Sequence, residues 1–205
     1  MPFLFTDQDI VAGSDAYVAR LPAKVASKEA LLQALDEHLR FPDYFGFNWD
    51  ALSECLRDFH WLESRTVVLV HADLPRLSLD ECRTYVGILS FAVTSWQPGE
   101  EHELRVIFPT DVRAEVIRLL VIDEFFQRDA TSAVRSMLQS ALQACSAATE
   151  PLIRRLELDR FEVTLDAATR SVLVEDVLDP SDDGMARLTF DELADVLVGS
   201  SSNDA

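Results

Sequence analysis

Apolar positions in the first half of the chain follow strand and helix patterns in turn. The uninterrupted apolar runs 66–71 and 103–108 are typical of strands buried on both faces, and the roughly alternating run 16–21 predicts a third strand. Segments with apolar residues at helical spacing separate these runs, beginning at about Ser27, Asn48 and Ser78. Strands that alternate with helices favour a parallel sheet. We therefore expect residues 1–108 to form an α/β domain, a small parallel sheet flanked by helices.

The pattern changes after Pro109, where helical periods are no longer interrupted by buried strands. Two long helical patterns come first, then two short alternating segments that suggest a β-hairpin, then an acidic turn and an amphipathic helix. These segments lie at residues 111–127, 131–147, 160–166, 171–177 and 179–184, and from 189 onward. We place a domain boundary near Pro109 and expect residues 109–205 to form a second, α+β domain, to which the sequence assigns no role.

The net charge narrows the classes of partner. The chain has 36 acidic residues against 18 Lys and Arg, a formal charge of −18 over 205 residues. Nucleic acids and anionic membranes bind basic surfaces, so neither is an expected partner, whereas a basic protein is. Neither a basic, apolar leader nor an apolar stretch long enough to span a bilayer is found, which predicts a cytoplasmic protein.

The sequence predicts neither a metal site nor a cofactor. The three cysteines are an odd number without C-x-x-C spacing, and no Gly-rich phosphate loop or nucleophile elbow is present. The acidic turn 179–184 begins like a calcium loop, but its twelfth position is Phe190 in place of the bidentate glutamate. Thr189 and Glu192 instead have the spacing of a capping box for the last helix.

Acidic residues recur along the helix expected after Asn48. Asp50, Glu54 and Asp58 have i, i+4, i+8 spacing, which predicts three carboxylates on one face, with Arg57 placed to offset their repulsion. One interpretation is a solvated acidic face. Another is a docking surface for a basic, concave partner, since aromatic residues precede the helix. A third, in which Asp50 and Glu54 act as an acid/base pair, requires a cleft.

The segment FPDYFGFNWDALSECL, residues 41–56, resembles the signature of the barstar family of intracellular ribonuclease inhibitors. Members of that family carry a Pro-acid-Tyr-aromatic-Gly-x-Asn-apolar-Asp-Ala-Leu segment, and the same helix, strand, helix, strand layout surrounds it. The resemblance covers about residues 16–108. Each element of this motif has its own expected physical role. Pro42 and Gly46 set the turn, Asn48 caps the helix, Asp50 faces outward, and Leu52 and Cys55 pack inward.

The resemblance implies an immunity protein rather than an enzyme, with no catalytic residue of its own. In the family, this loop and helix plug the active site of a ribonuclease, and their acids imitate RNA phosphates. The implied partner is a basic, extracellular-type ribonuclease or a bacterial ribonuclease toxin domain. The implied partner-binding residues are Tyr44, Phe45, Gly46, Asn48, Trp49, Asp50, Ser53 and Glu54.

Three departures from the family pattern predict that the partner is a related ribonuclease whose active site has a different rim. Ser53 replaces an interfacial aromatic residue, Arg57 adds a positive charge, and residues 84–96 lack the acid that the family's best-known member carries on its last helix. These departures also leave an alternative open. In it, the chain is an acidic scaffold or adaptor for a non-nuclease protein, and residues 109–205 are its main interaction or dimerisation module.

Overall fold

The computed structural model describes residues 1–8, 13, 15–97 and 99–199. The chain divides into two compact units, Met1–Val116 and Ile117–Ala205. The division falls within helix α4 (Arg113–Arg128), whereas the change of pattern had suggested a boundary near Pro109. The first turn of α4 belongs to the first unit, where the Arg113 guanidinium lies 5.9 Å from the Phe5 ring centroid.

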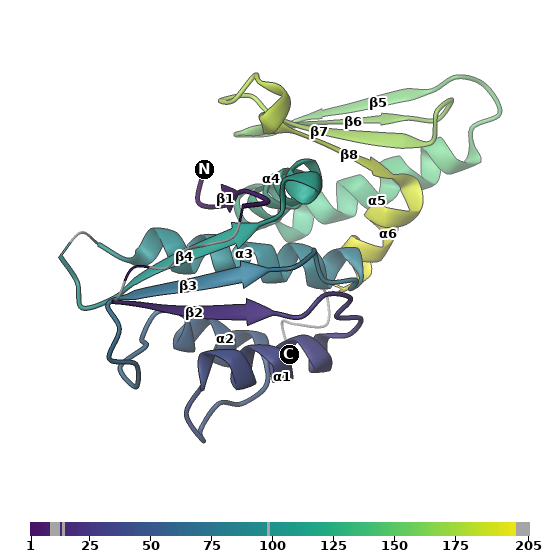
Figure 1. Cartoon of the computed structure of the whole chain (residues 1–205). Helices are drawn as coiled ribbons and strands as arrows, with labels where there is room; N and C mark the ends of the chain where they lie inside the picture. Colours follow the sequence, from purple (N-terminus) through teal and green to yellow (C-terminus); the bar gives the residue numbers. More distant parts are fainter. Residues whose placement is uncertain (9–12, 14, 98, 200–205) are drawn as a thin grey trace. The chain divides into compact units, whose positions relative to one another are not determined.

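The first unit contains a four-stranded parallel sheet in the order β1-β4-β3-β2 (Figure 1). Its strands are β1 (Leu4–Phe5), β2 (Ala16–Leu21), β3 (Thr66–His71) and β4 (Glu103–Phe108). Its helices are α1 (Lys28–Leu39), α2 (Trp49–Cys55) and α3 (Leu79–Ser95), with a 3-10 turn at Thr110–Val112 before α4. The predicted parallel sheet flanked by helices is confirmed, and β1 is an additional edge strand.

Local sequence explains where the helices of the first unit begin. The Ser27 hydroxyl accepts the Ala30 N–H at 3.2 Å, so the predicted cap of α1 is confirmed.

The leucines of α1 are at most 1% exposed and supply much of the core. The β3 residues Val67, Val68 and Leu69 are all buried, because helices or neighbouring strands cover a parallel strand on both faces.

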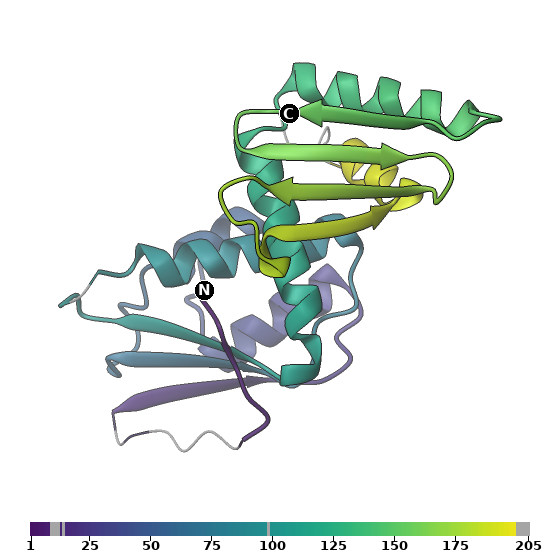
Figure 2. The same cartoon turned by 90° about the horizontal axis from the view of Figure 1, so that it is seen from above.

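The second unit contains a four-stranded antiparallel sheet in the order β5-β6-β7-β8. Figure 2 shows these strands side by side, and α5 packs against β5 and β6. The strands are β5 (Ile153–Glu157), β6 (Phe161–Asp166), β7 (Ser171–Asp176) and β8 (Met185–Thr189). The remaining elements are α5 (Ser132–Ala147), a 3-10 turn at Asp182–Gly184 and α6 (Phe190–Gly199).

The predicted hairpin is confirmed as β6 and β7, which bury alternate residues beneath the helices. The predicted capping box also forms, since the Thr189 hydroxyl accepts the Glu192 N–H at 3.1 Å and the Glu192 carboxylate accepts the Thr189 N–H at 2.7 Å. Strands β5 and β8 extend the hairpin on either side. In the part of the chain that the structure describes, no helix is long and apolar enough to cross a membrane.

Candidate partner-binding surface

The loop between α1 and α2 is held in one shape by its own residues. The Phe45 N–H donates to the Pro42 carbonyl at 2.8 Å, and the Asn48 side chain caps α2 by accepting the Ala51 N–H at 2.9 Å. The Asn48 amide also donates to the Gly46 carbonyl at 3.3 Å. A Cβ at position 46 would lie 3.0 Å from this amide, so the loop favours glycine there. The loop therefore reaches α2 in a defined geometry.

Most residues implied as partner contacts are accessible. Tyr44 is 65% exposed, and the other exposed members of the set are Gly46, Asn48, Asp50 and Glu54. Trp49 and Ser53 are half-buried. Phe45 differs from the others, because its ring is only 5% exposed and packs on Phe41 at a centroid distance of 4.6 Å. Its side chain therefore supports the loop from the core side.

Trp49 is fixed at the first turn of α2. Its ring stacks on the buried Tyr85 ring at a centroid distance of 6.2 Å, and Lys28 Nζ lies 4.9 Å from the Trp49 ring centroid. A half-buried indole held by a stacking ring and a cation loses little conformational entropy when a partner covers it. Trp49 is therefore a rigid part of the surface.

Helix α2 is shorter than its acidic pattern predicted. It ends at Cys55, and the next turn is tightened by bonds from the Arg57 N–H to the Glu54 carbonyl and from the Asp58 N–H to the Cys55 carbonyl. Asp50 and Glu54 thus lie one turn apart on the helix, but the expected third carboxylate, Asp58, lies beyond it. Asp58 instead contacts His60 Nδ1 at 2.7 Å.

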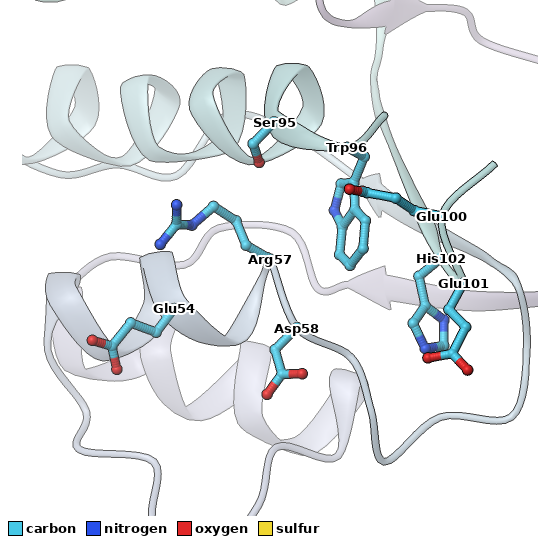
Figure 3. Close-up of a pocket in the computed structure, with 8 residues that line it drawn as sticks. All are labelled: Glu54, Arg57, Asp58, Ser95, Trp96, Glu100, Glu101 and His102. Atoms are coloured by element: carbon cyan, nitrogen blue, oxygen red, sulfur yellow. The ribbon is translucent and has the colours of Figure 1, made fainter. Parts of the chain in front are cut away.

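The expected partnership between Arg57 and Glu54 is also corrected. Arg57 Nε donates to the Ser53 carbonyl at 3.2 Å, and its guanidinium lies 4.8 Å from the Phe91 ring centroid. Figure 3 shows the Arg57 and Glu54 side chains diverging. Phe91 lies on α3 and is 52% exposed. The sequence analysis did not include it, because neighbouring residues of α3 gave no sign that this phenylalanine faces outward beside α2.

A pocket of about 660 Å³ adjoins the end of α2. It is lined by Glu54, Arg57, Asp58, Ser95, Trp96, Glu100, Glu101 and His102 (Figure 3). Glu100 and Glu101 come from the loop after α3, so acids reach this region although residues 84–96 contain none. Asp50 does not line the pocket, so Asp50 and Glu54 do not share it as an acid/base pair would.

Comparison with known families identifies the family to which this part of the chain belongs. The family described as Barstar (barnase inhibitor) matches residues 18–109. Residues 18–109 are therefore a barstar domain. The match includes most of β2, α1, the α1–α2 loop, α2, β3, α3 and β4, and it leaves β1 and the chain after residue 109 outside. No curated protein and no solved structure matches the chain.

Desolvation, together with nearby acids, raises the pKa of two groups in the barstar domain. The pKa of Tyr44 is raised, first by desolvation and then by the negative charges of Asp58 and Glu54. Burial and the same carboxylates raise the pKa of the Cys55 thiol to about 11, so this thiol stays protonated at neutral pH. The surface is therefore electronegative and its cysteine unreactive.

Charge and a fixed shape are the chemical features of this surface. In the described ranges of the chain, no group of three or more His, Cys, Asp or Glu side chains is placed to hold a metal ion. Proteins of the barstar family are inhibitors rather than enzymes. The fixed loop, the carboxylates of α2 and the adjoining acidic pocket suit the recognition of a cationic protein surface.

Proposed function

We propose that the barstar domain inhibits a ribonuclease by covering the enzyme's basic active site with the α1–α2 loop and the exposed face of α2. The observation that carries this proposal is the family match, which includes the segment bearing two exposed carboxylates one turn apart. Carboxylates at this spacing are suited to cationic groups that otherwise bind RNA phosphates. The proposed contact residues are Tyr44, Gly46, Asn48, Trp49, Asp50, Ser53 and Glu54.

Rigidity supports this role. The cap from Asn48 and the stacked ring of Trp49 hold the surface before a partner arrives, so little ordering is required on binding. The formal charge of −18 also attracts a basic enzyme over a distance, which raises the association rate. Because added salt screens exposed charges, association should slow as ionic strength rises.

The test is inhibition of RNA cleavage by barnase and by a panel of other basic microbial ribonucleases. The variant replaces Asp50 and Glu54 with alanine. Its matched control replaces Asp191 and Asp195, which are exposed at the same i, i+4 spacing at the start of α6 in the second unit. Both variants lose two negative charges, so comparison separates the position of the charges from their number.

We expect the α2 variant to bind the inhibited enzyme roughly 100-fold more weakly or worse, since each charge-assisted contact contributes about 1.5–3 kcal/mol. The α6 control should bind as tightly as wild type. Inhibition of no ribonuclease by the wild-type chain, or equal loss in the two variants, would contradict the proposal.

Arg57 favours a second candidate, an acidic scaffold for a non-nuclease protein. Its guanidinium on the exposed Phe91 ring adds a cation beside the carboxylates of α2. A basic enzyme would be repelled by this cation, whereas a partner with mixed charge would not. Capture of a partner without nuclease activity, equally by wild type and by the α2 variant, would favour this candidate.

A further inference from the structure

Strand β5 forms one edge of the second unit's sheet, and among the described residues no strand pairs with its other side. Two backbone bonds fix the phase of its pairing with β6. The Ala167 N–H donates to the Leu152 carbonyl at 2.9 Å, and the Leu158 N–H donates to the Phe161 carbonyl at 2.9 Å. Hydrogen-bonded and non-hydrogen-bonded pairs alternate along an antiparallel ladder, so this phase applies to the residues between.

Arg154 and Leu156 therefore direct their backbone N–H and C=O groups toward β6. The corresponding groups of Ile153, Arg155 and Glu157 point toward the open side. All three of these residues are exposed, Ile153 by 64%. An edge strand with outward backbone groups is a template for another strand.

The charges beside this edge are unbalanced. Glu157, Glu162 and Glu175 lie directly opposite one another on β5, β6 and β7. Like charges in directly opposite positions destabilise a sheet. Arg155 Nε approaches Glu162 at 3.2 Å, but Glu157 forms no ion pair with any of the residues described. The row of glutamates thus ends at the open edge without a cation.

The opposite face of the edge is also open. A groove of about 470 Å³ lies between α5 and β5. It is lined by Ser136, Met137, Ser140, Ala141, Ala144, Arg154, Arg155 and Leu156. Met137 is 50% exposed in this groove. Small side chains on α5 leave room for a second element beside β5.

We propose that β5 pairs antiparallel with β5 of a second copy of this chain, with Leu156 of the two copies facing each other on the two-fold axis. This register places Arg155 of each copy directly opposite Glu157 of the other. The row of glutamates in one copy then ends at a cation of its neighbour. The outward backbone groups of Ile153, Arg155 and Glu157 become available to the ladder between the copies.

Charge selects this register over its neighbours. The two β5 strands can bond only where outward-facing backbone groups of both copies lie opposite each other. Because these groups occur at every second residue, neighbouring registers differ by a shift of two residues. The adjacent register on one side sets Arg155 against Arg155 of the second copy, and the adjacent register on the other sets Glu157 against Glu157. Of these three registers, only the one centred on Leu156 sets Arg155 opposite Glu157 of the other copy twice and places no like charges directly opposite each other.

The first test measures the association of the full chain by sedimentation velocity over a concentration series. We expect wild type to be dimeric at high concentration. Arg155→Glu and Glu157→Arg should each raise the dimer dissociation constant about tenfold or more, because each substitution turns two attractive pairs into repulsive ones. The double exchange should restore association. Arg187→Glu, on the same face of β8 but away from this edge, should leave it unchanged.

The Glu157→Arg variant keeps the Arg155–Glu162 contact and removes the repulsion between Glu157 and Glu162, so we expect it to fold. A wild-type chain that stays monomeric, single variants that associate like wild type, or a double exchange that fails to restore association would each overturn the proposal.

Disulfide trapping tests the register itself. Residues on the axis form a non-hydrogen-bonded pair whose Cα atoms lie about 4.5 Å apart, within disulfide range. Leu156→Cys should therefore cross-link under mild oxidation, whereas Arg154→Cys, two residues from the axis, should not. The native cysteines are all buried and give little background. Cross-linking of Arg154→Cys in preference to Leu156→Cys would refute the register.

Discussion

Acidification is expected to destabilise the barstar domain through His71, at the end of β3. The His71 side chain is 3% exposed, with Nε2 2.8 Å from the Tyr85 hydroxyl and Nδ1 3.3 Å from the Ile107 carbonyl. The Phe108 ring stacks on the imidazole at a centroid distance of 4.0 Å. In the neutral tautomer that carries its proton on Nδ1, this nitrogen donates to the carbonyl while Nε2 accepts the tyrosine proton. A proton added to Nε2 would place an ion in the core.

Burial lowers the pKa of His71 to about 3, opposed in part by the hydrogen bond to Ile107. In the unfolded chain the pKa is about 6.5. Between these values the unfolded chain binds a proton that the folded domain does not, so the free energy of unfolding falls as the pH falls. Each pH unit well below 6.5 costs about 1.4 kcal/mol, which gives a loss of about 2 kcal/mol at about pH 5.

The assay is urea unfolding followed by tryptophan fluorescence in wild type and in His71→Gln. All three tryptophans lie in the first unit, so the signal reports on the unit that contains the barstar domain. Comparison with the variant cancels the contribution of carboxyl groups that titrate in both proteins. Between about pH 7.5 and about pH 5, wild type should lose about 2 kcal/mol more stability than the variant. Parallel pH dependences in the two proteins would refute this account of His71.

Two further substitutions test how each unit is held together. Asn48→Ala should lower the stability of the first unit by about 1 kcal/mol because it removes the cap of α2, and Asn48→Ser, which keeps an acceptor, should recover most of that loss in the same fluorescence assay. Gly184→Ala should destabilise the second unit by about 3 kcal/mol, because its Cβ would lie 1.9 Å from the Asp179 carbonyl oxygen. Gly13→Ala, whose Cβ meets nothing within 4 Å, is the calorimetric control, and equal unfolding temperatures in the two alanine variants would contradict the expected clash.

Features that depend on neighbouring residues could be predicted from the sequence. The strands 66–71 and 103–108 are uninterrupted apolar runs, and both were found where expected. The caps at Ser27 and Asn48 were also predicted, since a cap needs only a short polar side chain before an apolar period. The family resemblance of the α1–α2 loop was likewise visible, and the family match confirms it.

Features that depend on tertiary packing were missed or placed wrongly in the sequence analysis. Asp58 fits the i, i+4, i+8 pattern, but α2 ends before it where the chain turns toward the buried Phe59. Phe45 lies within the predicted contact loop, yet it packs into the core, since several aromatic residues in succession do not reveal which one turns inward. Strand β5 was not predicted, because an edge strand with exposed side chains lacks the alternation that marked β6 and β7.

The sequence by itself determined the alternation of strands and helices in the first unit, the β6–β7 hairpin, the caps at Ser27, Asn48 and Thr189, and the barstar resemblance of about residues 16–108. These properties follow from periodicity and from short polar signals, which act over a few residues. Only the tertiary structure decided that Arg57 lies on Phe91, that Glu100 and Glu101 border the same pocket as Glu54, and that the row from Glu157 to Glu175 ends at an open edge. These arrangements join residues far apart in the chain, and their positions depend on how the helices and strands pack.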